Sequence, residues 1–267
     1  MKKPLLTLMM ALALAPILAA QQKPTPSPTP GKRPPQAKTH EEFADYNTAY
    51  AVSGGGAAAE KAANDFAAKY PASELRSILY NKALHDYQSE NNAAKMLAMG
   101  EKVLALDPDN SVALVVTATV LSDSLSDADK DRQQKIDRIK KNVERALQTL
   151  EASFAAPAGA TPEQVAAYKN TLRSMAHSAL GITELKTGND AGAEKELRLS
   201  ADLGKDQPDP YIWYHLALSQ DHQEKFTEAL VSVEQAIKYS QPGSDLGKLA
   251  AGERDRLQKM TGSAANK

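Results

Sequence analysis

The sequence predicts an all-α protein made of a run of helical hairpins. After about residue 40, alanine, leucine, lysine and glutamate dominate, and the apolar–polar alternation that is typical of strands is absent. Seven of the fifteen prolines lie in this part, always between apolar-periodic segments and never within one. Because proline removes a backbone donor, it marks helix ends and first turns. These prolines recur about every 30 to 50 residues, a spacing that indicates repeated hairpins.

Residues 1–20 are predicted to be a secretory signal peptide rather than part of the fold. A short basic start is followed by the apolar run "LLTLMMALALAPILAA", which ends in small residues. The run is short for a membrane span and contains Pro16, so a retained anchor is the weaker alternative. A lipoprotein would need a cysteine, and the chain has none. We therefore expect an exported protein, periplasmic or extracellular and soluble after cleavage.

Residues 21–39 form a proline-rich basic segment. They hold six of the fifteen prolines, and four basic side chains without an acidic one. Such a composition favours extended polyproline conformations, so we expect a spacer; a docking motif for a proline-binding partner is the alternative. Six basic residues and no acid precede His40, so the rest of the chain carries a formal charge of −7 although the total is −1. This acidic body argues against nucleic acid as its partner.

The helical body is expected to span residues 40–262, with a short tail at 263–267. Its hairpins are predicted near 40–70, 77–108, 111–156, 162–205 and 210–242, followed by a polar capping helix at 244–260 that shields the last apolar face. In the first hairpin, "SGGG" at 53–56 would be the turn.

The stretch "EKVLALDPDN" shows how one hairpin ends and the next begins. Pro108 cannot continue the preceding helix, and Asn110 or Ser111 can cap the next one by accepting hydrogen bonds from its first amides. The third hairpin is the least regular, since an extended loop precedes a long, charged second helix near 130–152. The helix predicted over 162–186 is also longer than a repeat would need.

The last two hairpins carry small and apolar residues at matching offsets. The hairpin from Pro210 has Trp213, Leu216, Ala217, Phe226, Ala229, Val233 and Ala236, and the hairpin from Ser174 has Leu180, Gly181, Gly188 and Ala193. These residues resemble the tetratricopeptide repeat family, with Gln220 where tyrosine is usual and His177 in the aromatic place. Tyr80 and Tyr87 take corresponding places in an earlier hairpin. The resemblance implies a right-handed superhelix of four to five hairpins with a C-terminal capping helix.

The same resemblance implies a peptide-binding groove lined by the first helix of each hairpin. The residues that it points to are Ile78, Asn81, His85, Val115, Thr119, Met175, Ser178, Ile182, Tyr211, Tyr214, Leu218 and His222. This set is mostly apolar and lacks the lysine and asparagine pairs with which some family members clamp a terminal carboxylate, so we do not expect that mode. For each residue the alternative is packing against a neighbouring hairpin.

Catalytic and metal-binding patterns are weak. Asp127, Asp129 and Asp131 have the spacing of a calcium loop, but Arg132 and Arg138 occupy the places of its glycine and its bidentate carboxylate. Two histidines seven residues apart on a helix, His215 and His222, are about 10 Å apart, too far to share a metal. The sequence contains no nucleophile elbow and no phosphate-binding loop. We therefore expect no catalytic residue, no cofactor and no metal.

These observations predict a non-enzymatic scaffold or adaptor that binds a protein or peptide in the cell envelope through its concave face. Two alternatives remain at this point. One is a self-assembling structural component of the envelope. The other is an envelope enzyme or carbohydrate-binding factor built on a helical scaffold.

Overall fold

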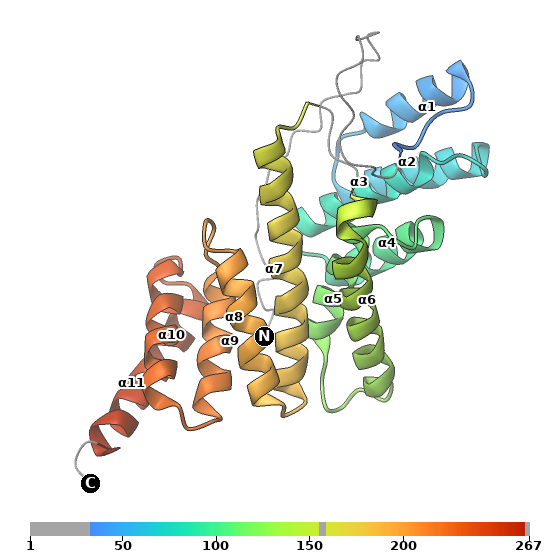
Figure 1. Ribbon diagram of the computed structural model, residues 1–267. Helices are drawn as coiled ribbons and strands as arrows, with labels where there is room; N and C mark the ends of the chain where they lie inside the picture. Colours follow the sequence, from blue (N-terminus) through green and yellow to red (C-terminus); the bar gives the residue numbers. More distant parts are fainter. Residues whose placement is uncertain (1–32, 155–158, 265–267) are drawn as a thin grey trace. The chain divides into compact units, whose positions relative to one another are not determined.

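The computed structural model describes residues 33–154 and 159–264, so the predicted signal peptide and most of the proline-rich segment lie outside the described residues. Within these ranges the chain forms eleven α-helices and no strand, which confirms the all-α prediction (Figure 1). The helices are α1 (His40–Tyr50), α2 (Gly56–Lys69), α3 (Arg76–Ser89), α4 (Ala93–Leu106), α5 (Ser111–Ser124), α6 (Arg132–Ser153), α7 (Pro162–Lys186), α8 (Asp190–Leu203), α9 (Pro210–Asp221), α10 (Phe226–Tyr239) and α11 (Asp245–Ala264). None of these described helices is long and apolar enough to cross a membrane.

The chain divides into two compact units, and the division falls within α5, α6 and α7. The N-terminal unit runs to Val120 and includes residues 144–166, and the C-terminal unit comprises residues 121–143 and everything from Ala167 on. In the N-terminal unit, α1 to α4 each pack against the next helix, and α1 also contacts α3. In the C-terminal unit, α8 to α11 do the same, and α9 also contacts α11. Helices that follow one another in the sequence are therefore neighbours in space.

Local sequence explains the helix ends that follow Pro108 and the "SGGG" run. The Asn110 side chain accepts a hydrogen bond from the backbone N–H of Ala113 at 3.0 Å, so Asn110 is the residue that caps α5. In the "SGGG" run, Gly54 and Gly55 have φ angles of 117° and 83°, a region that favours glycine, and they turn the chain between α1 and α2.

Three hairpins share one turn geometry between their two helices. In each, a residue with positive φ ends the first helix: Asn91 (55°), Gly188 (80°) and Glu224 (58°). The next N–H donates to the carbonyl oxygen five residues earlier, from Asn92 to Tyr87 at 2.9 Å, from Asn189 to Glu184 at 2.9 Å and from Lys225 to Gln220 at 3.0 Å. This is the Schellman arrangement, in which a left-handed residue lets two orphan carbonyls find donors. The turn therefore recurs at α3–α4, α7–α8 and α9–α10.

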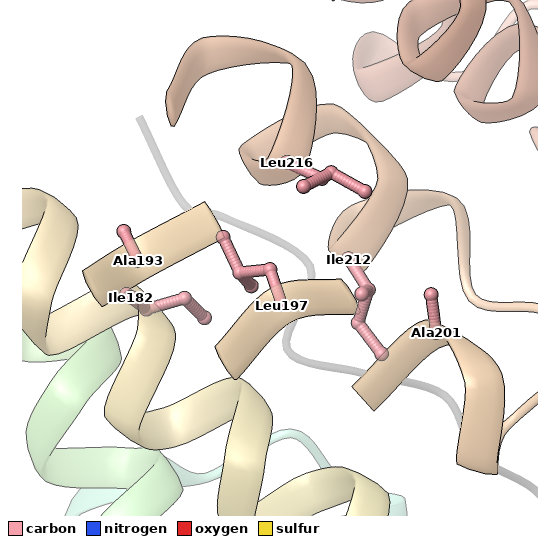
Figure 2. Close-up of a cluster of buried hydrophobic side chains, with 6 residues drawn as sticks. All are labelled: Ile182, Ala193, Leu197, Ala201, Ile212 and Leu216. Carbon is pink, nitrogen blue, oxygen red and sulfur yellow. The ribbon is translucent and has the colours of Figure 1, made fainter. Parts of the chain in front are cut away.

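Small residues set the spacing of the helices in the C-terminal unit. Ile182, Ala193, Leu197, Ala201, Ile212 and Leu216 form one buried cluster drawn from α7, α8 and α9 (Figure 2). A Cβ atom added to Gly181 would lie 2.7 Å from Cγ of Leu197, so only glycine permits this approach of α7 to α8. A second cluster joins α9, α10 and α11 through Ala217, Ala229, Val233, Ala236, Ala250 and Leu257. Alanine and glycine at the repeat offsets are thus packing positions.

The N-terminal unit buries larger side chains around α3. Leu79, Leu84 and Met99 are each 1% exposed, and the rings of Tyr46 and Phe66 meet edge to face with centroids 6.4 Å apart. The described end of the proline-rich segment is attached to this unit. Nη1 and Nη2 of Arg33 donate to the two oxygens of the Glu74 carboxylate, at 2.9 and 2.6 Å.

Candidate binding face

The twelve residues predicted to line a groove come from α3, α5, α7 and α9 and from the turn after α9, and they divide between the two units. The N-terminal unit holds Ile78, Asn81, His85, Val115 and Thr119, and the C-terminal unit holds Met175, Ser178, Ile182, Tyr211, Tyr214, Leu218 and His222.

In the N-terminal unit only part of the predicted set reaches the surface. His85 is exposed, and Ile78 and Asn81 are partly buried. Val115 is 1% exposed, because α5 is enclosed on almost every side, so Val115 is a core residue. The Thr119 hydroxyl donates to the carbonyl oxygen of Val115 at 3.0 Å, within its own helix.

In the C-terminal unit the predicted residues of α9 are more accessible than those of α7. Ile182 is 1% exposed within the cluster of Figure 2, and Ser178, one turn earlier on the same face of α7, is 9% exposed. Tyr211, Tyr214 and Leu218 are partly buried, as is Met175 on α7. His222 is exposed, and its Nδ1 lies 2.9 Å from a carboxylate oxygen of Asp190. Ile182 therefore packs against neighbouring helices instead of lining a groove, while α9 presents a mixed aromatic and aliphatic surface.

Tyr211 is held between two carboxylates. Asp209 precedes α9, and its Oδ1 accepts a hydrogen bond from the Tyr211 backbone N–H at 2.9 Å, which caps the helix. At the other end of the residue, the Tyr211 hydroxyl donates to Oδ1 of Asp123 at 3.1 Å. The ring also contacts the imidazole of His215, with centroids 4.1 Å apart. Tyr211 therefore connects the first turn of α9 to the last turn of α5.

Basic side chains bind the C-terminal end of α5, which carries Asp123, and the C-terminal end of α7. The Lys186 ammonium donates to the carbonyl oxygens of Ser122 and Asp123, both at 2.7 Å. A cation at this position stabilises the negative end of the α5 dipole. Arg132, at the start of α6, donates to the carbonyl oxygen of Lys186 at 2.7 Å. The C-terminal ends of α5 and α7 are thus joined to each other and to α6.

Burial governs the protonation of this cluster. Burial raises the pKa of Asp209 to about 6, against the lowering effect of its hydrogen bond from Tyr211, and the charge of Asp123 adds to the rise. The second carboxylate oxygen of Asp209 is buried and has no hydrogen-bond partner. Burial also raises the pKa of Tyr211, and Asp123 raises it further. The Tyr211 hydroxyl therefore stays protonated and acts as a donor.

The acidic loop before α6 is engaged by basic side chains. Lys135 lies 3.0 Å from Asp129 and 3.5 Å from Asp131, and Arg132 lies 3.1 Å from Asp127. The pKa of Asp129 is lowered by a hydrogen bond from the Ser126 backbone N–H and by Lys135. Among the described residues, no group of three histidine or acidic side chains is placed to hold a metal ion.

Sequence analysis missed the polar partners of Tyr211. Asp209 carries a local signal, since an aspartate directly before a proline at the start of a helix is a typical N-cap. Asp123 carries no such signal, because it lies 88 residues from Tyr211 in the chain and only the fold brings the two together.

No model of a known protein family matches the chain, and no curated protein sequence matches it. The assignment of function therefore depends on the residues and contacts described above.

Proposed function

We propose that this protein is an exported, non-enzymatic scaffold of the tetratricopeptide type, which binds an extended segment of another protein in the cell envelope along the first helices of its hairpins. The observation that carries the proposal is the partly buried surface of Tyr211, Tyr214 and Leu218 on α9. Tyrosine supplies large, rigid contact area with a polar tip, and it is enriched among the residues that dominate binding energy. Repeat proteins combine such surfaces from adjacent hairpins into one extended site.

Equivalent links between consecutive hairpins support the repeat assignment. In each of three hairpins, the residue that begins the shared turn contacts the second helix of the preceding hairpin. Tyr87 donates to Glu60 at 2.6 Å, Glu184 lies 2.9 Å from Lys140, and the Gln220 amide oxygen accepts from Arg198 at 2.8 Å. Gln220, which replaces the usual tyrosine, thus makes the kind of contact that Tyr87 makes. Its burial, at 1% exposed, is consistent with that role.

Contacts between first helices support a common face. The first helix α1 touches the first helix α3, and the first helix α9 touches α11, the helix at the position of the predicted cap, in addition to the contacts within each hairpin. In a tetratricopeptide superhelix the first helices lie side by side and line the concave surface. Side chains on the side of α9 that is turned away from α10 would then face a bound peptide.

The test is photo-crosslinking in intact cells, with a photoreactive residue in place of Tyr214. We expect capture of a specific envelope protein, and we expect Leu218→Glu on the same helix to abolish it by placing a charge on the contact surface. A photoreactive residue at Val231, which is 55% exposed on the second helix α10, is the matched control and should not capture that protein. Capture of nothing, or capture that Leu218→Glu does not affect, would refute the proposal.

Export is tested separately from binding. N-terminal sequencing of the protein from the envelope fraction should begin close to Gln21, after the predicted signal peptide. Recovery of an intact Met1 from the cytoplasm would refute export without affecting the binding assignment.

A further inference from the structure

We infer that residues 33–39 form a strap that holds α1 in place, and that release of the strap frees α1 from the N-terminal unit. The strap is the described end of the proline-rich segment, so this segment and the docking of α1 are coupled. The inference goes beyond the proposed function, because every residue that it uses belongs to the N-terminal unit and none belongs to α9.

Helix α1 buries few residues of its own. Of the residues of α1, only Glu42 and Tyr46 are buried, whereas α3 buries six residues. Tyr46 packs against Phe66 of α2, and Glu42 is 3% exposed. One buried aromatic side chain is a small apolar anchor for a helix. A buried carboxylate is costly unless hydrogen bonds replace the water that it loses. The docking of α1 therefore depends on what binds Glu42.

The strap supplies a hydrogen-bond donor to Glu42. The Lys38 backbone N–H donates to Oε2 of Glu42 at 2.7 Å, and the Thr39 hydroxyl accepts from the Glu42 backbone N–H at 3.1 Å. Thr39 and Glu42 have the spacing of a capping box, but here the carboxylate accepts from the N–H one residue before the cap. Oε1 of Glu42 is buried and has no hydrogen-bond partner. The bond from the strap therefore offsets part of the cost of burying this charge.

The remaining contacts of the strap lie on the turn between α2 and α3. Nζ of Lys38 donates to the carbonyl oxygen of Ala72 at 3.0 Å, and the Gln36 backbone N–H donates to Oε2 of Glu74 at 3.3 Å. The guanidinium of Arg33 binds the same carboxylate. One strap residue, Lys38, thus binds α1 through its backbone and the turn through its side chain. The strap therefore connects the start of α1 to the start of α3.

The anchors of the strap face solvent, which makes its release accessible. The side chains of Arg33 and Glu74 are 62% and 42% exposed, and an ion pair of such exposure contributes little because water and salt screen it. When the strap lifts, water can hydrate the carboxylate of Glu42. Helix α1 then keeps Tyr46 as its buried contact with α2.

The test is hydrogen–deuterium exchange of the full chain, followed for the amides of α1 and of α4. The double variant Arg33→Ala, Lys38→Ala removes two strap side chains that lie outside α1. We expect the α1 amides to exchange about 3- to 10-fold faster, the change that loss of one or two exposed polar contacts produces, and the α4 amides to be unchanged. Lys61→Ala is the matched control and should change neither, since Lys61 is 77% exposed and pairs with Asp65 on its own helix.

A second variant places the change on the turn instead of the strap. Glu74→Ala removes the acceptor of Arg33 and should also accelerate exchange in α1, and adding Arg33→Ala to it should give little further increase because the two groups bind each other. Faster exchange confined to α1 supports the strap. No increase in α1, equal increases in α1 and α4, or α1 amides without protection in the natural chain overturn it. No partner is present, so this result and that of the crosslinking are independent.

Discussion

At the scale of single residues, Asp209 caps α9 with one carboxylate oxygen, while its other carboxylate oxygen is buried and has no hydrogen-bond partner. Its pKa is raised to about 6, above the value of about 3.9 for an aspartate in an unfolded chain. A raised folded-state pKa means that the carboxyl stabilises the fold below about pH 4, and that this contribution is lost as the pH rises through about 6.

Asp209→Asn should therefore stabilise the protein at pH 7.5 by roughly 1–3 kcal/mol, because it removes the buried charge and keeps the cap. The advantage over the natural chain should disappear at about pH 4. Urea unfolding at both pH values measures the difference, and Asp209→Ala is the control that loses the cap as well. If the Asp209→Asn variant is less stable than the natural chain at pH 7.5, this account is contradicted.

Glu224 occupies a backbone conformation that favours glycine. Its φ is 58°, in the turn where the equivalent hairpin has Gly188 at 80°. Glu224→Gly should raise the free energy of unfolding by roughly 0.5–1 kcal/mol, because glycine has no Cβ to clash in the left-handed region. Asn91→Gly is the matched comparison and should gain less, since asparagine tolerates this region. The prediction is wrong if thermal unfolding shows that Glu224→Gly is destabilising.

At the scale of helices, replacing two glycines in helix interiors distinguishes the effect of side-chain packing from that of helix propensity. A Cβ on Gly181 would lie 2.7 Å from Cγ and 3.2 Å from the backbone nitrogen of Leu197, whereas a Cβ on Gly252 meets nothing within 4 Å. Both changes to alanine gain the same helix propensity, about 1 kcal/mol. Gly252→Ala should therefore stabilise by about that amount, and Gly181→Ala should destabilise by about 1–3 kcal/mol through overpacking. The denaturant midpoints of the two variants, each compared with that of the natural chain, measure these opposite effects. The prediction is wrong if both midpoints shift in the same direction.

The two long middle helices are shared between the compact units. The predicted helices near 130–152 and over 162–186 are present as α6 and α7, and both are longer than the others around them. The division between the compact units falls within these two helices and α5. Each of the two long helices therefore contributes residues to both units, as does α5, which has only 14 residues.

At the scale of the whole molecule, oligomeric state distinguishes an adaptor from a self-assembling component. Among the described residues, the exposed large apolar side chains are Leu199, Val231, Leu249 and Met260, two of them on α11. Single exposed apolar residues are common on monomers and do not by themselves form an interface. We expect light scattering after size exclusion to report a monomer across the micromolar range, for the natural chain and for Leu249→Glu alike. Concentration-dependent assembly that Leu249→Glu abolishes would instead favour the structural alternative.

Much of the helical organisation was predictable because its signals are local. Proline positions, the Asn110 cap and the "SGGG" turn each act within a few residues, and the helix bounds follow from them. The candidate face was less predictable. Val115 and Ile182 were placed on it by repeat register, but α5 and α7 bury residues on several sides, so an apolar position there does not distinguish core from surface.

The sequence by itself determined that the chain is helical and which small residues allow helices to approach. These properties depend on backbone propensity and on volumes that neighbouring residues set. Only the tertiary structure decided that Tyr211 bonds to Asp123 and that the ionisable side chain of Asp209 is buried. Both depend on residues far apart in the chain, and the distance and burial that fix a hydrogen bond or a pKa exist only after the helices have packed.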